Sequence, residues 1–252
     1  MRLAFLGTGS AMPTGNRRQT GMLLESGTRR LLVDCGSGVL HGLAETEAGY
    51  EGVDTVLLTH HHVDHVSDFM PLLKAKWLAG SESLTLAGPP GTADLLDGLL
   101  SVHEYMRDRI DISVREVTPG SFEIAGFGVD AIETRHSMRC HAYRFADPRG
   151  QGDGDVTISG DTEAFPELAS FADGSDVLVH DCSFPDEVDV SNHPTPALLG
   201  ETLAGHEFGT VYLTHLYPHT RGRHREMLDS LSKNYDGEIR FASDGTTVDV
   251  GP

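Results

Sequence analysis

The chain has 252 residues, of which 38% are hydrophobic, so it is long enough to bury the core of one α/β domain, expected to span residues 1–252. Its formal net charge of −19 argues against the broad basic surface that nonspecific nucleic-acid binding requires. No apolar stretch approaches the ~20 residues that span a bilayer, and a strand-like segment begins directly at the N-terminus, which leaves no room for a signal peptide. We expect a soluble, cytoplasmic protein.

The charge is distributed unusually, because lysine occurs only at Lys74, Lys76 and Lys233 while aspartate is abundant. Abundant aspartate with scarce lysine suggests a halophilic source, since concentrated salt screens the repulsion among surface carboxylates. An acidic protein from an ordinary environment is the alternative interpretation.

Alternating or continuous apolar runs between glycine-containing turns predict the strands, and apolar residues at helical spacing predict the helices. Strands are expected at Arg2–Gly7, Thr20–Ser26, Arg29–Asp34, Val53–Leu58, Ser83–Ala87, several places within Ile110–Arg144, the run ending at Asp161, the runs ending at Asp181 and Thr214, and near Ile239–Ala242 and Thr247–Val250. Helices are expected at Val39–Glu47, Asp68–Ala79, Thr92–Tyr105, Pro166–Ala172, Pro194–Ala204 and Arg223–Leu231. The Gly- and Asp-rich stretch Asp147–Asp155 is the expected mobile loop.

The run T-H-H-H-V-D-H at residues 59–65 directly follows one of these predicted strands. In an extended chain, side chains two residues apart share a face, so His60 and His62 can converge on one ion. The chain must then turn, which can aim Asp64 and His65 at a second ion. Imidazole nitrogen and carboxylate oxygen are ligands that zinc and similar ions accept. A surface histidine run is the alternative, but this run lies between an apolar strand and an apolar helix.

Three further donors, His136, Asp161 and His215, each lie at the C-terminal end of an apolar run. A sheet edge can bring together ligands from strands that are far apart in the sequence. Taken singly, an aspartate after glycine is usually part of a turn, and a histidine is usually a satisfied polar group. The joint pattern favours a shared metal site, in which His61 is expected to face outward and take no part.

Four segments carry a resemblance to a known family: Leu6–Pro13, Val33–Gly36, Ser159–Thr162 and Leu213–His215. Together with the histidine run, they make the chain resemble metallo-β-lactamase-fold hydrolases, and most of all the branch that holds ribonuclease Z and small cyclic-phosphate phosphodiesterases. The resemblance covers nearly the whole length. It implies a mixed α/β fold, a four-layered αββα sandwich with metals at one edge of the sheets.

The resemblance also implies two divalent metal ions and assigns their ligands. One ion would be held by His60, His62 and His136, and the other by Asp64, His65 and His215, with Asp161 as the bridge. Two ions about 3.5–4 Å apart can lower the pKa of water toward neutrality and clamp a phosphoryl oxygen. Seven ligands leave coordination positions open for water and substrate, as catalysis requires. Zinc is the expected metal, and manganese or iron are alternatives.

A purely structural metal site would more often be a closed set of four ligands that includes cysteine. The three cysteines, Cys35, Cys140 and Cys182, stand at no C-x-x-C spacing. They also form no disulfide framework, because three cannot all pair within one chain.

A second pair of residues is implied by the same resemblance. In the related hydrolases an acidic residue orients a histidine that acts as general acid toward the leaving oxygen; by position these are Asp181 and His193. A neighbouring carboxylate would raise the pKa of the imidazole. The alternative is that His193 caps the helix expected from Pro194 and that Asp181 belongs to a turn.

The chain departs from ribonuclease Z in ways that bear on its substrate. That enzyme usually carries a protruding arm for tRNA between the counterparts of His136 and Asp161, and the stretch His141–Gly160 is too short for one. Asp181 also stands where glutamate is usual. The phosphonate-pathway phosphodiesterases often carry an N-terminal cysteine cluster, which is absent here. An armless phosphodiesterase is the interpretation that remains, and tRNA binding is doubtful.

The leading hypothesis is therefore a dinuclear metal-dependent phosphodiesterase acting on a small or nucleotide-like phosphodiester, in which Asp64 assists the attacking water and His193 protonates the leaving group. One alternative is a tRNA 3′ endonuclease with a substitute tRNA-binding surface, which the partner in a homodimer could supply. Another is a metal-binding protein of the same fold without turnover.

One end of the predicted site is expected to hold Tyr217, His219, Arg221, Arg223 and His224, and the loop that carries Arg17 and Arg18 can face the same opening. Arginine suits bidentate contacts to phosphate. The alternative is a solvated helix start with arginine on its polar face.

Overall fold

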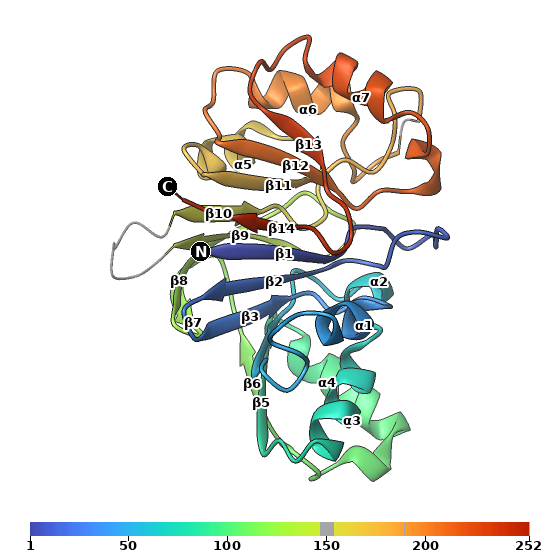
Figure 1. The fold of residues 1–252 in the computed structure, drawn as a ribbon, viewed down its shortest axis with the longest axis vertical. Helices are drawn as coiled ribbons and strands as arrows, with labels where there is room; N and C mark the ends of the chain where they lie inside the picture. Colours follow the sequence, from blue (N-terminus) through green and yellow to red (C-terminus); the bar gives the residue numbers. More distant parts are fainter. Residues whose placement is uncertain (147–153, 189, 252) are drawn as a thin grey trace.

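The computed structural model describes residues 1–146, 154–188 and 190–251, whose strands form two seven-stranded sheets (Figure 1). The first sheet has the order β14 (Thr247–Asp249), β1 (Arg2–Gly7), β2 (Gly21–Ser26), β3 (Arg29–Val33), β4 (Thr55–Leu57), β5 (Ser83–Gly88) and β6 (Asp111–Glu116). The second has the order β13 (Ile239–Phe241), β12 (Thr210–Thr214), β11 (Val177–Asp181), β10 (Asp155–Ile158), β9 (His141–Ala146), β8 (Phe127–Glu133) and β7 (Gly120–Ile124).

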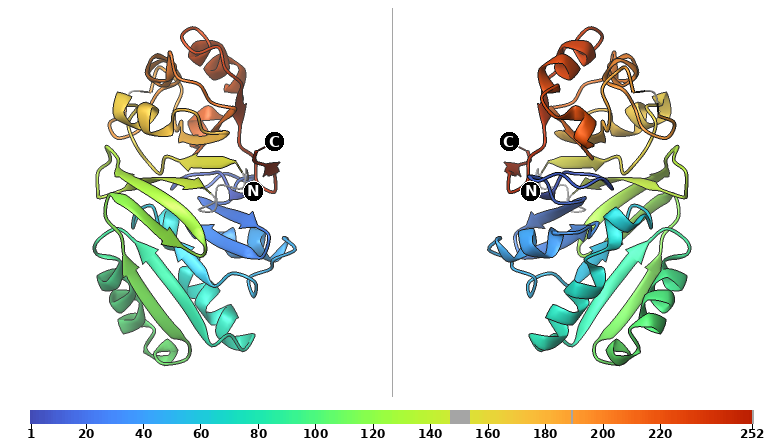
Figure 2. Two further views of the ribbon diagram at one scale, coloured as in Figure 1. Left: turned by 90° about the vertical axis from the view of Figure 1, so that its left-hand side faces the viewer. Right: turned by 90° about the vertical axis from the view of Figure 1, so that its right-hand side faces the viewer.

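The helices form an outer layer on each side of the paired sheets (Figures 1 and 2). On the first sheet lie α1 (Val39–Ala44), α2 (Val63–Val66), α3 (Phe69–Leu78) and α4 (Thr92–Val102), followed by the short 3₁₀ helix η1 (Glu104–Met106). On the second lie α5 (Pro166–Ala172), α6 (Pro196–Leu203) and α7 (His224–Leu231), with the 3₁₀ helix η2 (Pro218–Thr220) between β12 and α7. This arrangement confirms the predicted four-layered αββα sandwich.

Three of the apolar clusters in the described part of the chain fill the three interfaces between layers. Phe5 from the first sheet and Tyr143 and Phe145 from the second belong to the buried cluster that fills the space between the sheets. Leu72 belongs to the cluster beneath the helices of the first sheet, and Leu199 to the corresponding cluster on the second. Burial of apolar area at all three interfaces is the main stabilisation available to this architecture.

Each predicted helix and strand has an observed counterpart, with differences at the ends. Helix α6 begins at Pro196 instead of Pro194, because Thr195 is its N-cap and accepts a hydrogen bond from the Leu198 amide at 3.5 Å. The one-turn helix α2 was not predicted, since four residues are too few to show a helical period. The predicted mobile loop lies outside the described residues, except for Gly154 and for Asp155, which begins β10.

In the described part of the chain, no helix has the length and apolarity that crossing a bilayer requires.

Strand direction explains why one edge of the sandwich gathers polar residues. Strands β3, β4, β5 and β6 are parallel to one another, as are β10, β11, β12 and β13. Strand β8 runs in the same direction as β10, because both are antiparallel to β9, which lies between them. The carboxyl ends of these strands therefore meet at common edges, and the connections that leave them can face each other across the two sheets.

Candidate metal centre

Each predicted metal-binding residue follows the carboxyl end of a strand. The histidine run follows β4, His136 follows β8, Asp161 follows β10 and His215 follows β12. The sequence folds this way because apolar β-branched strands carry the chain through the core and end where the polar side chains begin. The structure brings all seven predicted donors together at one edge, although His60 and His215 are far apart in the chain.

Four of these residues form a first group in which the nitrogens nearly touch. His62 Nδ1 lies 3.0 Å from His60 Nε2 and 3.1 Å from His136 Nε2. Asp161 Oδ2 lies 3.7 Å from His60 Nε2 and 3.9 Å from His136 Nε2. Ligands placed 2.0–2.1 Å from a tetrahedral zinc ion are about 3.3 Å apart, so these separations suit one divalent ion.

A second group lies on the other side of Asp161. His215 Nε2 is 3.2 Å from Asp64 Oδ2 and 3.1 Å from Asp161 Oδ2. His65 Nε2 is 3.8 Å from Asp64 Oδ2 and 3.4 Å from Asp161 Oδ1. The Asp161 carboxylate thus lies between the two groups, in the place of a bridging ligand.

One buried atom tests whether these residues fit a metal. His65 is fully buried, and its Nε2 has no hydrogen-bond partner among the described residues. Its Nδ1 lies 2.8 Å from Asp34 Oδ2, which fixes the proton on Nδ1 and leaves the Nε2 lone pair facing Asp161 and Asp64. A nitrogen that faces two carboxylates in a buried site favours a cation between them, and a divalent ion can take that place instead of a proton.

The charges of the isolated protein point the same way. Burial lowers the pKa of His65, but Asp161 and Asp34 outweigh this and hold it well above the ordinary value. Burial would raise the pKa of Asp161, yet His215 and His65 keep it well below the usual range. Burial, aided by His65, lowers the pKa of His60 far enough to keep this imidazole neutral, the form in which histidine binds metal.

Strained backbone concentrates at this edge. Five non-glycine residues in the described part have left-handed φ, and three of them lie here: Asp34 at 61°, Asn192 at 73° and His215 at 58°. Each holds or is a predicted ligand. Asp34 accepts hydrogen bonds from Thr59 and from His65, and the Asn192 carbonyl lies 3.3 Å from His136 Nδ1. Such strain costs on the order of 1–3 kcal/mol per residue and persists where the surroundings enforce it.

The predicted Asp181–His193 pair is formed in the structure. His193 Nδ1 donates to Asp181 Oδ2 over 2.6 Å, and Asp181 is fully buried at the end of β11. Burial lowers the pKa of His193, but Asp181 more than reverses this, and the net effect raises it to about 9. The helix-capping alternative is wrong, because Thr195 caps α6 and Asp181 is a strand residue.

A pocket of about 470 Å³ opens over both groups and over His193. Apolar side chains form much of its lining, from Ala11, Val63 and Val190 to Phe184 and Tyr217, whose rings stack at 4.4 Å. Among the described residues, none that line this pocket is a lysine or an arginine. Positive charge for a substrate would therefore have to come from His193 and from metal ions held by the two groups of donors.

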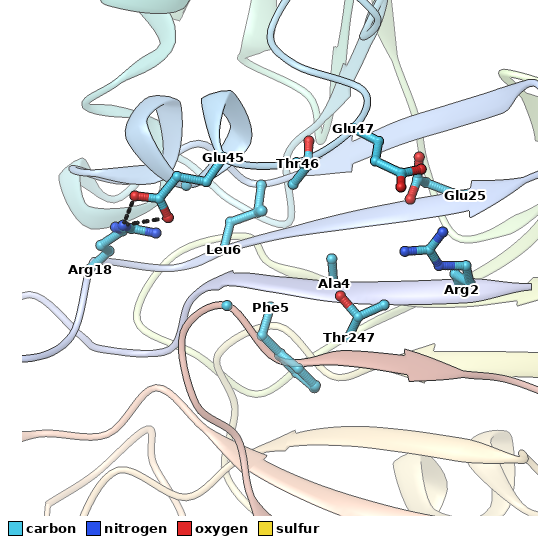
Figure 3. A pocket seen from close by; sticks show the side chains of 12 residues that line it. Arg2, Ala4, Phe5, Leu6, Arg18, Glu25, Glu45, Thr46, Glu47 and Thr247 are labelled. Carbon is cyan, nitrogen blue, oxygen red and sulfur yellow. Dashed lines mark hydrogen bonds and ion pairs between the residues drawn. The ribbon is translucent and has the colours of Figure 1, made fainter.

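The arginines at the N-terminal loop do not face this pocket, so the prediction for Arg17 and Arg18 is wrong. Arg17 donates to Thr8 Oγ1 and, over 2.7 Å, to the Ala242 carbonyl. Arg18 donates to both carboxylate oxygens of Glu45 at 3.0 Å, in a separate groove along β1 and α1 that Figure 3 shows. Both guanidinium groups are therefore engaged in contacts within the fold.

The residues after His215 support both interpretations in part, the one that places them at the site and the one that places them on a solvated helix start. Tyr217 lines the pocket, whereas Arg223 pairs with Glu226 at 2.6 Å at the start of α7. His61 is also not a fully outward-facing residue: it is half-buried, with Nε2 2.8 Å from Thr92 Oγ1. It belongs to neither group of donors in the described residues.

Comparison with known proteins identifies the family. The family model described as Anti-Pycsar protein Apyc1 matches residues 1–221. The chain belongs to this family. It is also 29% identical to ribonuclease Z of Mycobacterium bovis (strain BCG / Pasteur 1173P2) over 280 aligned positions, which cover 100% of this chain and 99% of that enzyme.

Solved structures agree with the fold of this Apyc1-family chain. The metallo-β-lactamase fold protein YhfI from Bacillus subtilis superimposes with a TM-score of 0.83 at 25% identity, covering 98% of each chain. The short form of human tRNase Z superimposes with a TM-score of 0.80 at 20% identity, covering 100% of both chains. These findings confirm the predicted metallo-β-lactamase fold, the likeness to ribonuclease Z and a metal-dependent hydrolase.

Some residues that shape the centre were not singled out from the sequence. Asp34 lies within the segment Val33–Gly36 but had no assigned role, and Ser183 lies two residues after Asp181. The Asn192 carbonyl gives no signal in the sequence, because any residue could supply it. Phe184 becomes recognisable as part of the lining only once the connection after β11 lies beside Tyr217, which the sequence had already placed near the site.

Proposed function

We propose that this protein is a dinuclear metal-dependent phosphodiesterase, with zinc as the metal and a small or nucleotide-like phosphodiester as the substrate. The proposed ligands are those that the resemblance implied: His60, His62 and His136 for one ion, Asp64, His65 and His215 for the other, and Asp161 between them. The observation that carries the proposal is the convergence of this donor set with the Asp181–His193 pair in one pocket.

The bound ions would lower the pKa of water and stabilise charge on the phosphoryl oxygens. The protein's own residues supply the remaining chemistry. The Asp64 carboxylate, 5% exposed, lines the pocket and can accept a hydrogen bond that orients the attacking water. His193 is held by Asp181 with its proton on Nδ1, so Nε2 is the atom that protonates the leaving oxygen. A leaving alkoxide needs that proton, and Asp181 raises the pKa of His193, which favours the charged imidazole at neutral pH.

The lining of the pocket supports a small substrate. A polynucleotide is held by several lysine or arginine contacts to its phosphates, and the described lining offers none. The net charge of −19 opposes a polyanion further. A single phosphodiester carries one negative charge that the two ions and His193 can balance, and its organic part can contact the apolar rim formed by Val63, Val190 and the Phe184–Tyr217 stack.

The direct test is turnover by the purified, metal-loaded protein in concentrated salt. We expect hydrolysis of bis-p-nitrophenyl phosphate or of a cyclic nucleotide. The rate should be lost in Asp64→Ala and strongly reduced in His193→Ala, which retains all seven proposed ligands. Equal rates for the wild-type protein and Asp64→Ala on every phosphodiester tested would overturn the proposal. Elemental analysis of the same samples identifies the metal.

A tRNA 3′ endonuclease is the second candidate, because the identity to the Mycobacterium bovis ribonuclease Z extends over the whole chain. Against it, much of the segment from His141 to Gly160 pairs as β9 and β10, so its described residues form no protruding arm. Such an enzyme would need a substitute tRNA-binding surface, for example from a partner in a homodimer. Incubation with an unprocessed tRNA decides between the candidates: a discrete trailer supports the endonuclease, and an intact precursor eliminates it.

We propose one domain over residues 1–252, a halophilic source and a cytoplasmic location, and the acidic composition supports the second of these.

A further inference from the structure

Ser183 lies between the second group of proposed ligands and the proposed general acid. It follows β11 by two residues and is fully buried. Its Oγ lies 2.6 Å from Asp181 Oδ1 and 2.9 Å from His215 Nδ1. It also lies 3.0 Å from the His215 carbonyl oxygen and 3.3 Å from His193 Nδ1.

A serine hydroxyl can donate one hydrogen bond and can accept two, one at each lone pair. Its proton goes to Asp181 Oδ1, because that contact is shorter than the one to the His215 carbonyl and the acceptor is charged. The hydroxyl oxygen is then free to accept the proton on His215 Nδ1. A chain of hydrogen bonds therefore runs from His215 through Ser183 to Asp181.

The chain of hydrogen bonds determines which nitrogen of His215 is free. With the proton on Nδ1, the lone pair is on Nε2, which faces Asp64 at 3.2 Å and Asp161 at 3.1 Å. Asp181 cannot hold this tautomer directly, since its Oδ1 is 3.9 Å from His215 Nδ1, beyond hydrogen-bond distance. Asp34 makes the corresponding contact to His65 without an intermediary, over 2.8 Å.

The other oxygen of Asp181 serves the general acid. Oδ2 accepts from His193 Nδ1 over 2.6 Å, and from the Thr162 amide over 3.3 Å. One buried carboxylate thus orients both His193 and, through Ser183, His215. His215 also has left-handed backbone with φ of 58°, so its position depends on contacts such as this one.

We propose that Ser183 is a positioning residue that couples binding of the second metal ion to the orientation of the general acid, through the shared carboxylate of Asp181. The proposal rests on the proposed metal site and deepens it. It predicts that Asp181, which is not a ligand, contributes to metal affinity, and that this contribution depends on the Ser183 hydroxyl.

The experiment is a double-mutant cycle that measures Zn²⁺ affinity by competition with a chelating dye, with no substrate present. Ser183→Ala should weaken the second of the two binding steps by about 10- to 100-fold and leave the first unchanged, as loss of a hydrogen bond to a ligating histidine does. Asp181→Asn should weaken the same step. In the Ser183→Ala background, Asp181→Asn should have little further effect, because the connection to His215 is already lost.

Two further variants separate positioning from general structural damage. Ser183→Thr keeps the hydroxyl and should restore most of the affinity. Ser175→Ala removes a hydroxyl that is equally buried, lies before β11 at its other end, and bonds Thr157 at 2.7 Å. It should leave both binding steps unchanged. Circular dichroism confirms folding of each variant.

A spectroscopic measurement avoids variants that fail to fold. In the zinc-loaded wild-type protein, proton NMR should show the His215 Nδ1–H as a downfield resonance protected from exchange. Additive effects of the two substitutions, or a rapidly exchanging His215 proton, would overturn the coupling. The affinity measurements need no substrate, so they test the coupling even if the protein hydrolyses no phosphodiester. If the protein does hydrolyse a phosphodiester but the effects of the two substitutions are additive, the coupling is refuted and the proposed function is not.

Discussion

Replacing Asp181 by asparagine should move the alkaline limit of activity to lower pH. The buried carboxylate raises the pKa of His193 from 6.5 to about 9 against the effect of burial. The protonated imidazole is the active form, so activity persists below that pKa and falls as the pH rises through it. Asparagine keeps the size of the side chain and removes the charge, so the pKa of His193 should fall back toward its ordinary value of 6.5, with burial lowering it and Asp161 and Asp64 still raising it.

A return to 6.5 is a displacement of about 2.5 pH units, equivalent to roughly 3 kcal/mol. At pH 8, about nine-tenths of His193 is protonated in the wild-type protein and about 3% in Asp181→Asn, a difference of about 30-fold in rate. Below pH 6 the two rates should converge. Bound metal ions lower the pKa of His193 in both proteins, so the displacement between the two profiles is the quantity to measure.

The assay is the pH dependence of kcat on bis-p-nitrophenyl phosphate, with metal content checked at each pH so that loss of metal is not read as loss of the acid. His193→Ala should show no alkaline limb from this group. If Asp181→Asn and the wild-type protein gave superimposable profiles, the assignment of His193 as an acid poised by Asp181 would be wrong.

Three further predictions concern the metal site and the surface. Asp34→Asn should weaken Zn²⁺ binding by about 10- to 100-fold in chelator competition. Asp34 accepts hydrogen bonds from Thr59 N, Thr59 Oγ1 and His65 Nδ1, and an amide would turn its NH₂ group toward one of these donors. Unchanged affinity would contradict this role. Gly36→Ala should lower the free energy of unfolding by about 1–3 kcal/mol in urea titrations, because a Cβ there would lie 2.0 Å from the Asp64 carbonyl oxygen. An unchanged free energy would mean that the loop around Gly36 can move to make room. The melting temperature should rise from 0.1 M to 2 M KCl, because salt screens the −19 charge, and a flat response would argue against a halophilic source.

The donors of the proposed metal site could be predicted from the sequence because short-range rules govern where they lie. In the histidine run, alternation along an extended chain puts His60 and His62 on one face, and the glycines and apolar runs around Asp161 and His215 mark strand ends. The one-turn helix α2 inside the run was not visible, yet it is what turns Asp64 and His65 toward the second group. A four-residue segment has no period from which a helix could be inferred.

The arginines show the opposite case. Arg17, Arg18 and Arg223 are close in sequence to residues that line the pocket, and the prediction that Arg17 and Arg18 face it was wrong. A guanidinium group can extend in many directions, and its partner is decided by whichever carboxylate or carbonyl the fold places nearby, here Glu45 for Arg18 and the Ala242 carbonyl for Arg17. Sequence proximity does not specify such contacts.

The amino-acid sequence by itself determined the type of chemistry: which donors are present, that they terminate strands, and that they suit divalent ions in a layered α/β protein. Only the tertiary structure decided how those donors are held, through Asp34 at His65, Ser183 at His215 and a backbone carbonyl at His136. The reason is physical. Ligand type follows from the side chain alone, whereas the tautomer and direction of an imidazole depend on partners that the packing of two sheets brings within 3 Å or so.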